Sequence, residues 1–439
     1  MKRFRLGVDV GTTRVKSAVV DENGNIVSFA SYQIRLYIEG NRIEIDPEEL
    51  WRAVVAVIKQ TTSSDFIKEN LIGLSLATQG GTLILLDEKN NPIRRAITWM
   101  DTRAKEENEE LLENYGAEFF YKITGWLPSQ ACLPLSQLLW LRKKETDTFR
   151  KIAKCHFVDS YLLYRLTKNE CTDWTNAAIT MLSNIREKKW DERLLKIVGI
   201  SEEQLPLIKP PGTPISSLSE TASTELGLPR DTLVFSGGHD QYCSALGAGI
   251  ERAGEVLLSA GTAWVVLAIT DKPYFSSTYE FYPGPHLREN LWGALTSIPY
   301  GGASYDWFLK NILMNKISYE EADELIKKAE GETPIFKPFL SQNESKAVFS
   351  NLAINHTTGH LLRAIMEGIA QEVKRKIQIM IQEGIEIRSL KMVGGGARSS
   401  VWQSIVSQTL RLPVSIPPNL ETACLGAALL VNLKKGDEI

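Results

Sequence analysis

The sequence has few cysteines, no long apolar run and no excess of either charge. Its five cysteines are scattered along 439 residues without a C-x-x-C pair, so neither a disulfide framework nor a structural zinc site is predicted. No apolar run approaches the roughly 18 residues of a membrane-spanning helix, and no signal-like segment opens the chain. We therefore expect a cytoplasmic protein with reduced, mostly buried cysteines.

Charge and motif content exclude further classes of protein. The 50 basic and 53 acidic residues give a net charge of −3, which provides no basic face for nucleic acid. Neither G-x-G-x-x-G nor G-x-x-x-x-G-K-S/T occurs, so Rossmann and Walker-type nucleotide sites are disfavoured. Because 43% of the residues are hydrophobic, the chain can bury the cores of two large α/β domains.

A glycine-containing turn separates two β-rich runs near the N-terminus. Phe4–Val10 and Val15–Val20 predict two strands, with Gly11, Thr12 and Thr13 between them. Gly11 permits a tight turn, and the threonines add hydroxyl groups to the bare N–H groups at its tip. Such a turn can surround a phosphate group. The alternative is an ordinary N-terminal hairpin.

Two charged residues flank this turn, and its pattern recurs later in the chain. Asp9 lies near the end of the first strand, where a carboxylate could hold hydrated Mg²⁺ against phosphate oxygens, and Lys16 adds a cation. At 255–270, the residues Gly261-Thr262-Ala263 again separate two apolar runs. The repeat predicts a duplicated fold in which two phosphate-binding turns face each other across a cleft.

Two segments that follow predicted strands contain candidate ligand contacts. Strand Ile72–Leu76 leads into the loop 77–82, where adjacent Gly80 and Gly81 allow a close approach to a ligand. In the segment 99–103, Trp99 could stack on a sugar ring, and Asp101 or Arg103 could bind hydroxyl groups. The alternative is that Asp101 caps the helix predicted at 104–114 and pairs with Arg103.

A further candidate lies at a strand-to-helix turn. Strand Thr232–Ser236 is followed by Gly237-Gly238-His239-Asp240-Gln241 and by a small-residue helix, Cys243–Gly249. The carboxylate of Asp240 is placed to work in a cleft, with a solvated turn as the alternative. We interpret the neighbouring His239 as structural.

The C-terminal part predicts a nucleotide site. Strand Ser389–Val393 enters Gly394-Gly395-Gly396-Ala397, and the helix Ser399–Leu410 follows, so glycine backbone and a helix N-terminus can bind a nucleotide. Elsewhere, Asp46 and Pro47 begin a helix. Thr357–Ile381 is predicted as the longest helix, with an apolar stripe that faces the core. Residues 130–190 are interpreted as helical scaffold.

The order of these elements resembles that in the FGGY family of carbohydrate kinases, within the actin-like ATPase superfamily, from about Arg5 to Val431. The resemblance implies an α/β fold with two ribonuclease-H-like domains, each a mixed β-sheet with flanking helices, and a cleft between them for ATP and sugar. We place the N-terminal domain, with the sugar site and first phosphate motif, at 1–242. The C-terminal domain, with the second phosphate and adenosine motifs, is placed at 243–439.

The resemblance also implies roles for individual residues, with Asp240 as the catalytic base. The substrate contacts it implies are Gln79, Gly80, Gly81, Thr82, Trp99, Asp101, Arg103, Asp240 and Gln241. The nucleotide contacts are Gly11, Thr12, Thr13, Lys16, Gly261, Thr262, Gly302, Gly395, Gly396, Ala397 and Ser400. Asp9 and Asp240 are the expected Mg²⁺ ligands, through water. We expect ATP and Mg²⁺ as cofactors, a small sugar or polyol as partner, no nucleic acid and no membrane, and leave a homodimer open.

The loop 79–82 departs from the patterns of characterised members. Glycerol kinases have an Arg-Glu pair there and xylulose kinases a Met-His pair, whereas this chain has Gln79-Gly80-Gly81-Thr82. We expect the glycines to leave a roomier pocket for a pentulose, a hexulose or an alditol larger than glycerol, whose hydroxyl group is deprotonated by Asp240 and phosphorylated. The alternatives are an aldonate bound by Arg103, or an actin-like ATPase whose nucleotide state controls partner binding.

Overall fold

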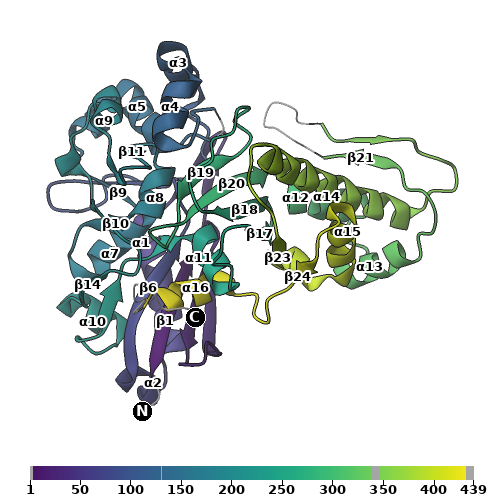
Figure 1. Ribbon diagram of the computed structural model, residues 1–439. Helices are drawn as coiled ribbons and strands as arrows, with labels where there is room; N and C mark the ends of the chain where they lie inside the picture. Colours follow the sequence, from purple (N-terminus) through teal and green to yellow (C-terminus); the bar gives the residue numbers. More distant parts are fainter. Residues whose placement is uncertain (1–2, 130, 339–345, 432–439) are drawn as a thin grey trace. The chain divides into compact units, whose positions relative to one another are not determined.

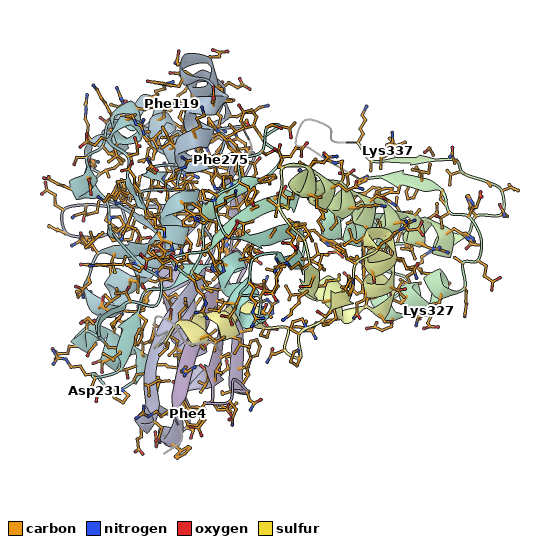
Figure 2. All side chains as sticks on the ribbon, viewed as in Figure 1. Phe4, Phe119, Asp231, Phe275, Lys327 and Lys337 are labelled. Carbon is orange, nitrogen blue, oxygen red and sulfur yellow. The ribbon has the colours of Figure 1, made fainter. Side chains whose placement is uncertain are left out.

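A computed structural model describes residues 3–129, 131–338 and 346–431 of the chain (Figure 1). The chain divides into two compact units. Unit 1 extends to Gly247 and also takes Pro283–Leu291 and the segment that begins at Glu421. Unit 2 takes Ala248–Tyr282 and Trp292–Leu420. Side chains fill the space between sheets and helices in each unit (Figure 2).

Unit 1 is built on a mixed sheet that contains the N-terminal hairpin. Its strand order is β14 (Pro214–Ser217), β15 (Leu233–Phe235), β6 (Leu71–Thr78), β1 (Phe4–Val10), β2 (Arg14–Val20), β3 (Ile26–Gln33), and β16 (Gly238–His239) also pairs with β6. β1 and β2 are antiparallel, as the hairpin predicts, whereas β1 and β6 are parallel. Because β6 and β16 are parallel, the loop after Thr78 and the turn after His239 leave the sheet side by side.

Helices cover both faces of this sheet. Leu6 and Val8 of β1 share a buried cluster with Trp51 of α1 (Pro47–Thr61), which begins at the predicted N-cap Asp46. On the other face, a Cβ atom at Gly7 would overlap the carbonyl oxygen of Cys424 in α16 (Thr422–Leu430). Helix α16 also packs against α11 (Asp240–Gly247), as Figure 1 shows. The helix with the candidate base therefore depends on a segment from the far end of the chain.

The rest of unit 1 consists of a second sheet and a set of short helices. The second sheet has the order β4 (Tyr37–Glu39), β5 (Arg42–Ile45), β8 (Ala96–Ile97), β7 (Leu83–Leu86), β9 (Lys154–Phe157). Two-stranded pairs are β10 (Cys171–Asp173) with β13 (Leu207–Lys209), and β11 (Ser183–Asn184) with β12 (Lys189–Trp190). The helices are α2 (Asp65–Glu69), α3 (Lys105–Tyr115), α4 (Ala117–Thr124), α5 (Pro134–Lys144), α6 (Thr146–Arg150), α7 (Val158–Thr167), α8 (Trp174–Ile179), α9 (Glu192–Val198), the 3-10 helix η1 (Glu202–Gln204) and α10 (Glu220–Leu226). Residues 130–190 were predicted to be helical: α5 to α8 confirm helices there, but the short strands β9, β10, β11 and β12 also lie within the range.

Unit 2 repeats the strand pattern of unit 1. Its sheet has the order β20 (Trp292–Ile298), β18 (Trp264–Thr270), β17 (Glu255–Ala260), β23 (Ser389–Val393), β24 (Val414–Ser415). Strand β19 (Tyr282–Pro285) is the neighbour of β20 in the strand order, but its residues from Pro283 onward are assigned to unit 1. From β20 to β24 the pairings are antiparallel, antiparallel, parallel and parallel. The path from β3 to β15 in unit 1 has the same four pairings in the same order. The duplication predicted from the two turns is thus confirmed by topology.

Helices and a small hairpin complete unit 2. They are α12 (Gly301–Trp307), the π-helix η2 (Phe308–Ile312), α13 (Tyr319–Lys327), β21 (Ile335–Lys337), β22 (Val348–Ser350), α14 (Thr358–Gln382), the 3-10 helix η3 (Gly395–Arg398) and α15 (Ser400–Leu410). Helix α14 is 25 residues long, and its predicted apolar stripe is buried from Leu362 to Met380. The compact units are not consecutive halves like the predicted domains 1–242 and 243–439, because α16 returns to unit 1.

Candidate active site

The turn between β1 and β2 presents its tip groups in unit 1. The N–H of Gly11 donates to the carbonyl oxygen of Arg14 at 3.0 Å, which closes the turn. Thr13 is exposed at the tip, and Thr12 is partly exposed. The Thr12 hydroxyl donates to Gln79 Oε1 at 2.9 Å and accepts from Trp99 Nε1 at 2.9 Å. The first predicted phosphate turn is therefore bonded directly to the predicted sugar-binding loop and to Trp99.

Asp9 lies at the base of this turn among other charged groups. It is the register partner of Lys16 across the hairpin, and Lys16 Nζ forms an ion pair with Glu421 Oε2 at 2.6 Å. Burial raises the pKa of Asp9 to about 7, Lys16 opposes this shift, and the carboxylates of Asp240 and Glu421 reinforce it. Carboxylates gathered in this way favour a bound cation. Sequence reasoning missed Glu421, since only the fold brings it next to Lys16.

Asp240 is the first residue of α11, directly after β16. The two preceding residues are glycines for steric reasons: a Cβ atom at Gly237 would overlap the carbonyl oxygen of Leu76, and one at Gly238 would overlap Leu287. The Asp240 side chain is 23% exposed. Burial raises its pKa to about 6, while hydrogen bonding from Gln241 partly opposes the shift. A carboxylate with a pKa near neutrality is well matched to accept a proton from a hydroxyl group.

Three consecutive residues at this turn carry buried polar atoms that lack a partner. Within the described residues, His239 Nδ1, Asp240 Oδ1 and Gln241 Oε1 form no hydrogen bond. Each such atom costs about 1–3 kcal/mol when it stays unpaired. The concentration of three at one turn is typical of a site that is completed by a polar ligand.

The N-terminal end of helix α8 fixes the backbone near Asp240. Asp173 caps α8 and accepts a hydrogen bond from Asn176 Nδ2 at 2.6 Å. Asn176 accepts in turn from Thr78 Oγ1 at 3.2 Å, and Thr175 Oγ1 accepts from the N–H of His239 at 2.8 Å. The ends of β6 and β16 are thus held by one buried polar network.

Gln79 connects the end of β6 to the phosphate turn. Its side chain is buried, its Nε2 donates to the carbonyl oxygen of Gly11 at 3.4 Å, and Thr82 Oγ1 donates to its Oε1 at 3.3 Å. Trp99 is 38% exposed although its indole N–H is bonded to Thr12. An anchored indole with an exposed face is a suitable platform for a sugar ring.

Asp101 and Arg103 are bonded to each other, which is the alternative that the sequence left open for them. Arg103 Nε donates to Asp101 Oδ1 at 2.8 Å, and its Nη2 lies 2.6 Å from Asp101 Oδ2 and 2.7 Å from Glu44 Oε1. Asp101 Oδ2 also accepts from the N–H of Ile43 at 2.7 Å. Asp101 does not cap α3, whose N-cap is Ala104. The buried pair ties the segment after β8 to β5 and so positions Trp99.

The expected extra room at Gly80 and Gly81 is not present. A Cβ atom at Gly80 would lie 2.8 Å from Ile179 Cγ2 and 2.9 Å from His239 Cδ2. At Gly81, where φ is +75°, it would lie 2.7 Å from Leu133 Cδ2. Side chains from other elements already fill this space, so the prediction of a roomier pocket was wrong.

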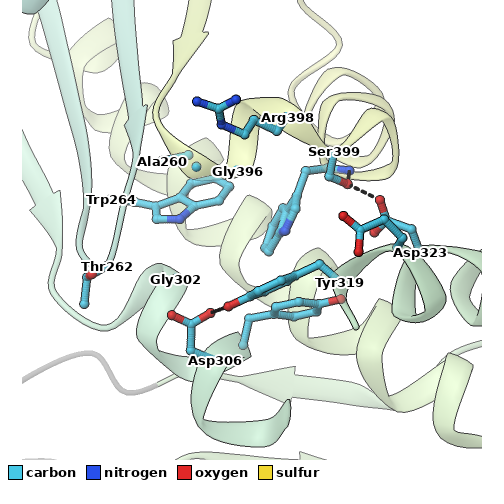
Figure 3. Close-up of a pocket in the computed structure, with 15 residues that line it drawn as sticks. Ala260, Thr262, Trp264, Gly302, Asp306, Tyr319, Asp323, Gly396, Arg398 and Ser399 are labelled. Carbon is cyan, nitrogen blue, oxygen red and sulfur yellow. Dashed lines mark hydrogen bonds between the residues drawn. The ribbon is translucent and has the colours of Figure 1, made fainter. Parts of the chain in front are cut away.

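Unit 2 contains a cavity of about 540 Å³ next to the second Gly-Thr turn (Figure 3). Of the predicted nucleotide contacts, those that line it are Gly261, Thr262, Gly302, Gly395 and Gly396. A Cβ atom at Gly302 would overlap the carbonyl oxygen of Gly261, so glycine is required where α12 packs against the turn. Ala397 is buried in the core, and Ser400 is the first residue of α15; neither is among the described residues that line the cavity.

Aromatic and acidic side chains that the sequence did not reveal form the walls of this cavity. Trp264 and Trp402 pack with ring centroids 4.7 Å apart. Tyr319 donates its hydroxyl to Asp306 Oδ1 at 2.8 Å, and Ser399 Oγ donates to Asp323 Oδ2 at 2.7 Å (Figure 3). These residues come from β18, α12, α13 and α15, and no local sequence signal joins them. A flat apolar wall with acceptors at its edge suits a nucleoside.

Two family models match the chain. The model described as the N-terminal domain of the FGGY family of carbohydrate kinases matches residues 4–247, and the model of the C-terminal domain matches residues 256–434. The chain belongs to the FGGY family of carbohydrate kinases. This confirms the family and the enzyme class, so this FGGY kinase uses ATP to phosphorylate a carbohydrate or polyol.

Relatives of this FGGY kinase align over nearly its whole length. A xylulose kinase of Staphylococcus epidermidis is 27% identical over 441 residues, which cover 98% of this chain and 88% of the relative. A gluconokinase of Bacillus subtilis is 25% identical over 451 residues, which cover 98% and 87%. The crystal structure of a gluconate kinase from Lactobacillus acidophilus superimposes with a TM-score of 0.91 at 25% identity and covers 98% and 89% of the two chains. The predicted α/β fold class is confirmed.

Two features are absent from the residues that the structure describes. Among them, no group of three or more His, Cys, Asp or Glu side chains is arranged to hold a metal ion. Within the same ranges, no helix combines the length and the apolar character that crossing a membrane requires.

Proposed function

We propose that this FGGY kinase transfers the γ-phosphoryl group of ATP to a hydroxyl group of a neutral ketose or alditol, with Asp240 as the general base. The observation that carries this proposal is the cluster of unpartnered polar atoms at residues 239–241, which includes Asp240 Oδ1. A sugar hydroxyl group can donate to such an oxygen. The relatives named for xylulose and gluconate phosphorylation support a substrate of this size.

The base acts by orientation and proton transfer. Phosphoryl transfer requires an aligned acceptor oxygen and stabilised charge more than covalent help from the protein. Asp240 accepts the hydrogen bond of the acceptor hydroxyl, fixes its oxygen, and takes its proton as the bond to phosphorus forms. Because burial keeps the pKa of Asp240 at about 6, its carboxylate is ionised at pH 7 and still basic enough to accept the proton.

The two Gly-Thr turns provide donors for phosphate oxygens. Each offers backbone N–H groups and a threonine hydroxyl, Thr13 at an exposed tip in unit 1 and Thr262 beside the cavity in unit 2. Lys16 contributes positive charge, part of which is neutralised by its ion pair with Glu421.

Mg²⁺ fits the carboxylates of unit 1. Asp9 and Asp240 lie close enough for the charge of one to raise the pKa of the other, and Mg²⁺ favours one or two carboxylates together with water and phosphate oxygens. These two residues would hold the hydrated ion, which neutralises phosphate charge when it is bound. Asp9 would hold the ion through water, and Asp240 would also be the proton acceptor.

The charges near the substrate loop favour a neutral substrate over an aldonate. Arg103, the cation that would bind a carboxylate, is buried between Asp101, Glu44 and the ring of Trp140 at 5.2 Å. Gln79, Gln241 and the exposed indole of Trp99 suit hydroxyl groups and a ring face instead. A site built on such hydrogen bonds discriminates stereoisomers strongly, because a misplaced hydroxyl leaves a buried group unpaired.

A substrate screen tests this proposal. We expect a coupled ADP-release assay with pentuloses, hexuloses, alditols, aldonates and glycerol to give one or two preferred neutral substrates and a negligible rate with glycerol. A preference for gluconate or another aldonate would contradict the assignment of a neutral substrate, and Arg103→Gln would then distinguish direct binding from support of Trp99. ADP release that is independent of any added acceptor would contradict the proposed transfer.

A further inference from the structure

We propose that His239 is a positioning residue for Asp240, and that position 80 is glycine because the imidazole of His239 and the side chain of Ile179 occupy the space beside it. The inference rests on the proposed function, in which Asp240 is the base. It assigns a role to a histidine whose sequence context indicated only structure. It also explains the glycine at position 80 without a roomier pocket.

His239 approaches the base directly. Its Nε2 lies 3.3 Å from Asp240 Oδ1, and its side chain is 10% exposed. Asp240 Oδ1 forms no hydrogen bond within the described residues, so the two atoms are close but not yet aligned. Contacts of this kind at catalytic groups are often long in the free enzyme and tighten when substrate binds.

The imidazole can act as a donor to the carboxylate. A neutral imidazole has one N–H donor and one acceptor nitrogen, and its environment selects which nitrogen carries the hydrogen. A carboxylate only accepts, so the tautomer with hydrogen on Nε2 is the favourable one beside Asp240. A hydrogen bond from Nε2 to Oδ1 would fix the carboxylate plane and leave the second lone pair of Oδ1 for the substrate hydroxyl.

The backbone holds His239 firmly in this place. Its N–H donates to Thr175 Oγ1 at 2.8 Å, and it is the register partner of Thr78 at the end of β6. Its ring also packs edge-on against Tyr242, with centroids 6.1 Å apart. A side chain restrained on these sides loses little entropy when it orients a neighbour.

Gly80 completes the arrangement. Since a Cβ atom there would lie 2.9 Å from His239 Cδ2, any side chain at position 80 displaces the imidazole edge next to Nε2. The glycine, in the loop after β6, and the histidine, at the end of β16, therefore form a matched pair. Substitution of Gly80 should act on catalysis through His239.

Kinetics of His239 variants test the role. We expect His239→Leu to lower kcat about 10- to 100-fold, while the KM for ATP changes by less than about twofold. His239→Gln places an amide nitrogen at the same number of bonds from Cα as Nε2 and should restore kcat to within about fivefold of the wild type. His356 is a partly exposed histidine in unit 2. The same substitution there, His356→Leu, serves as the control and should leave kcat unchanged. Thermal unfolding of each variant verifies the fold.

The outcomes separate this inference from the proposed function. If His239→Leu retains wild-type kcat, or if the Gln and Leu variants lose kcat equally while both remain folded, the positioning role is wrong. Asp240→Asn is measured in parallel, and its activity decides the base assignment independently of His239. A double-mutant cycle completes the test: Gly80→Ala should lower kcat in the wild type and lower it less in the His239→Leu background, where only the contact with Ile179 remains. Additive losses would contradict the matched pair.

Discussion

At the scale of single residues, the proposed mechanism depends on Asp240. Asp240→Asn keeps the shape of the side chain but removes its basicity, so we expect kcat to fall by about 10³-fold or more. Binding of ATP should persist, because the cavity proposed for the nucleotide lies in unit 2 and is not lined by Asp240. Steady-state kinetics with the best substrate and calorimetric titration with ATP measure the two effects. Turnover like that of the wild type would remove Asp240 from the mechanism.

The buried carboxylate of Asp9 is proposed to hold Mg²⁺, but its ionisation lowers the free energy of unfolding when the ion is absent. The pKa of its carboxyl is raised to about 7 in the folded protein from 3.8 in the unfolded chain. The folded state therefore binds more protons between these values, and the stabilisation from this group is present below pH 3.8 and lost as pH rises through about 7. Asp9→Asn should thus raise the free energy of unfolding at pH 8, without Mg²⁺, by on the order of 1 to 4 kcal/mol.

The same variant provides its own control. Near pH 4 the carboxyl of Asp9 is protonated in the folded protein, so the gain in the free energy of unfolding should shrink toward zero. Denaturant unfolding at both pH values measures it. If the gain were equal at pH 4 and pH 8, the ionisation of Asp9 would not be its cause. We expect the stabilised variant to lose activity.

At the scale of single elements, the N-terminal end of α8 links the candidate base to the substrate loop. Thr175→Val removes the acceptor of the His239 N–H, which then stays buried and unpaired. We expect the free energy of unfolding to fall by about 1–3 kcal/mol and kcat to fall as well, with the KM for ATP unchanged. Thr180→Val, at the other end of α8, is a matched control because Thr180 is equally buried and bonds only backbone atoms near α8. A loss of kcat in the control alone would contradict the link.

The sequence was informative about elements whose signal is local. The hairpins around Gly11 and Gly261, the strand before the triple glycine and the apolar stripe of α14 were predicted because periodicity and turn residues determine them within a short window. Strands β9 and β10 were missed because they are short and lie between helices. Helix α11 begins at Asp240, three residues before the predicted start at Cys243. The earlier start was missed because Asp240 and Gln241 are polar and do not extend the small-residue pattern.

The candidate site was predictable where it rests on turns and not where it rests on packing. Asp240 and both Gly-Thr turns follow from glycine patterns. Glu421 and His239 acquire their surroundings from elements far away in sequence, so their neighbours decide their roles. The loop at Gly80 shows the limit most clearly: a missing side chain indicated space, whereas Ile179 and His239 fill that space from other elements.

At the scale of the whole molecule, the return of the chain to unit 1 is the main departure from two consecutive domains. Helix α16 fits against α11 only through glycine, since a Cβ atom at Gly426 would overlap the carbonyl oxygen of Cys243. We expect Gly426→Ala to lower the free energy of unfolding of unit 1 by about 2–4 kcal/mol. Ala423→Gly in the same helix should cost only the helix propensity of about 1 kcal/mol. Calorimetry that separates the two units measures the effect, and equal losses would contradict the tight crossing.

The late position of α16 also sets an order of events during synthesis. When the ribosome has made the chain as far as Leu420, every residue of unit 2 exists, but unit 1 still lacks the helix that covers Gly7 and packs on α11. Unit 1 therefore keeps one face of its central sheet uncovered until α16 has been synthesised, although unit 1 was synthesised first. Asp9, Lys16 and Asp240 gain their final surroundings only when Glu421 and α16 have left the exit tunnel, so chains truncated before α16 lack the complete candidate site.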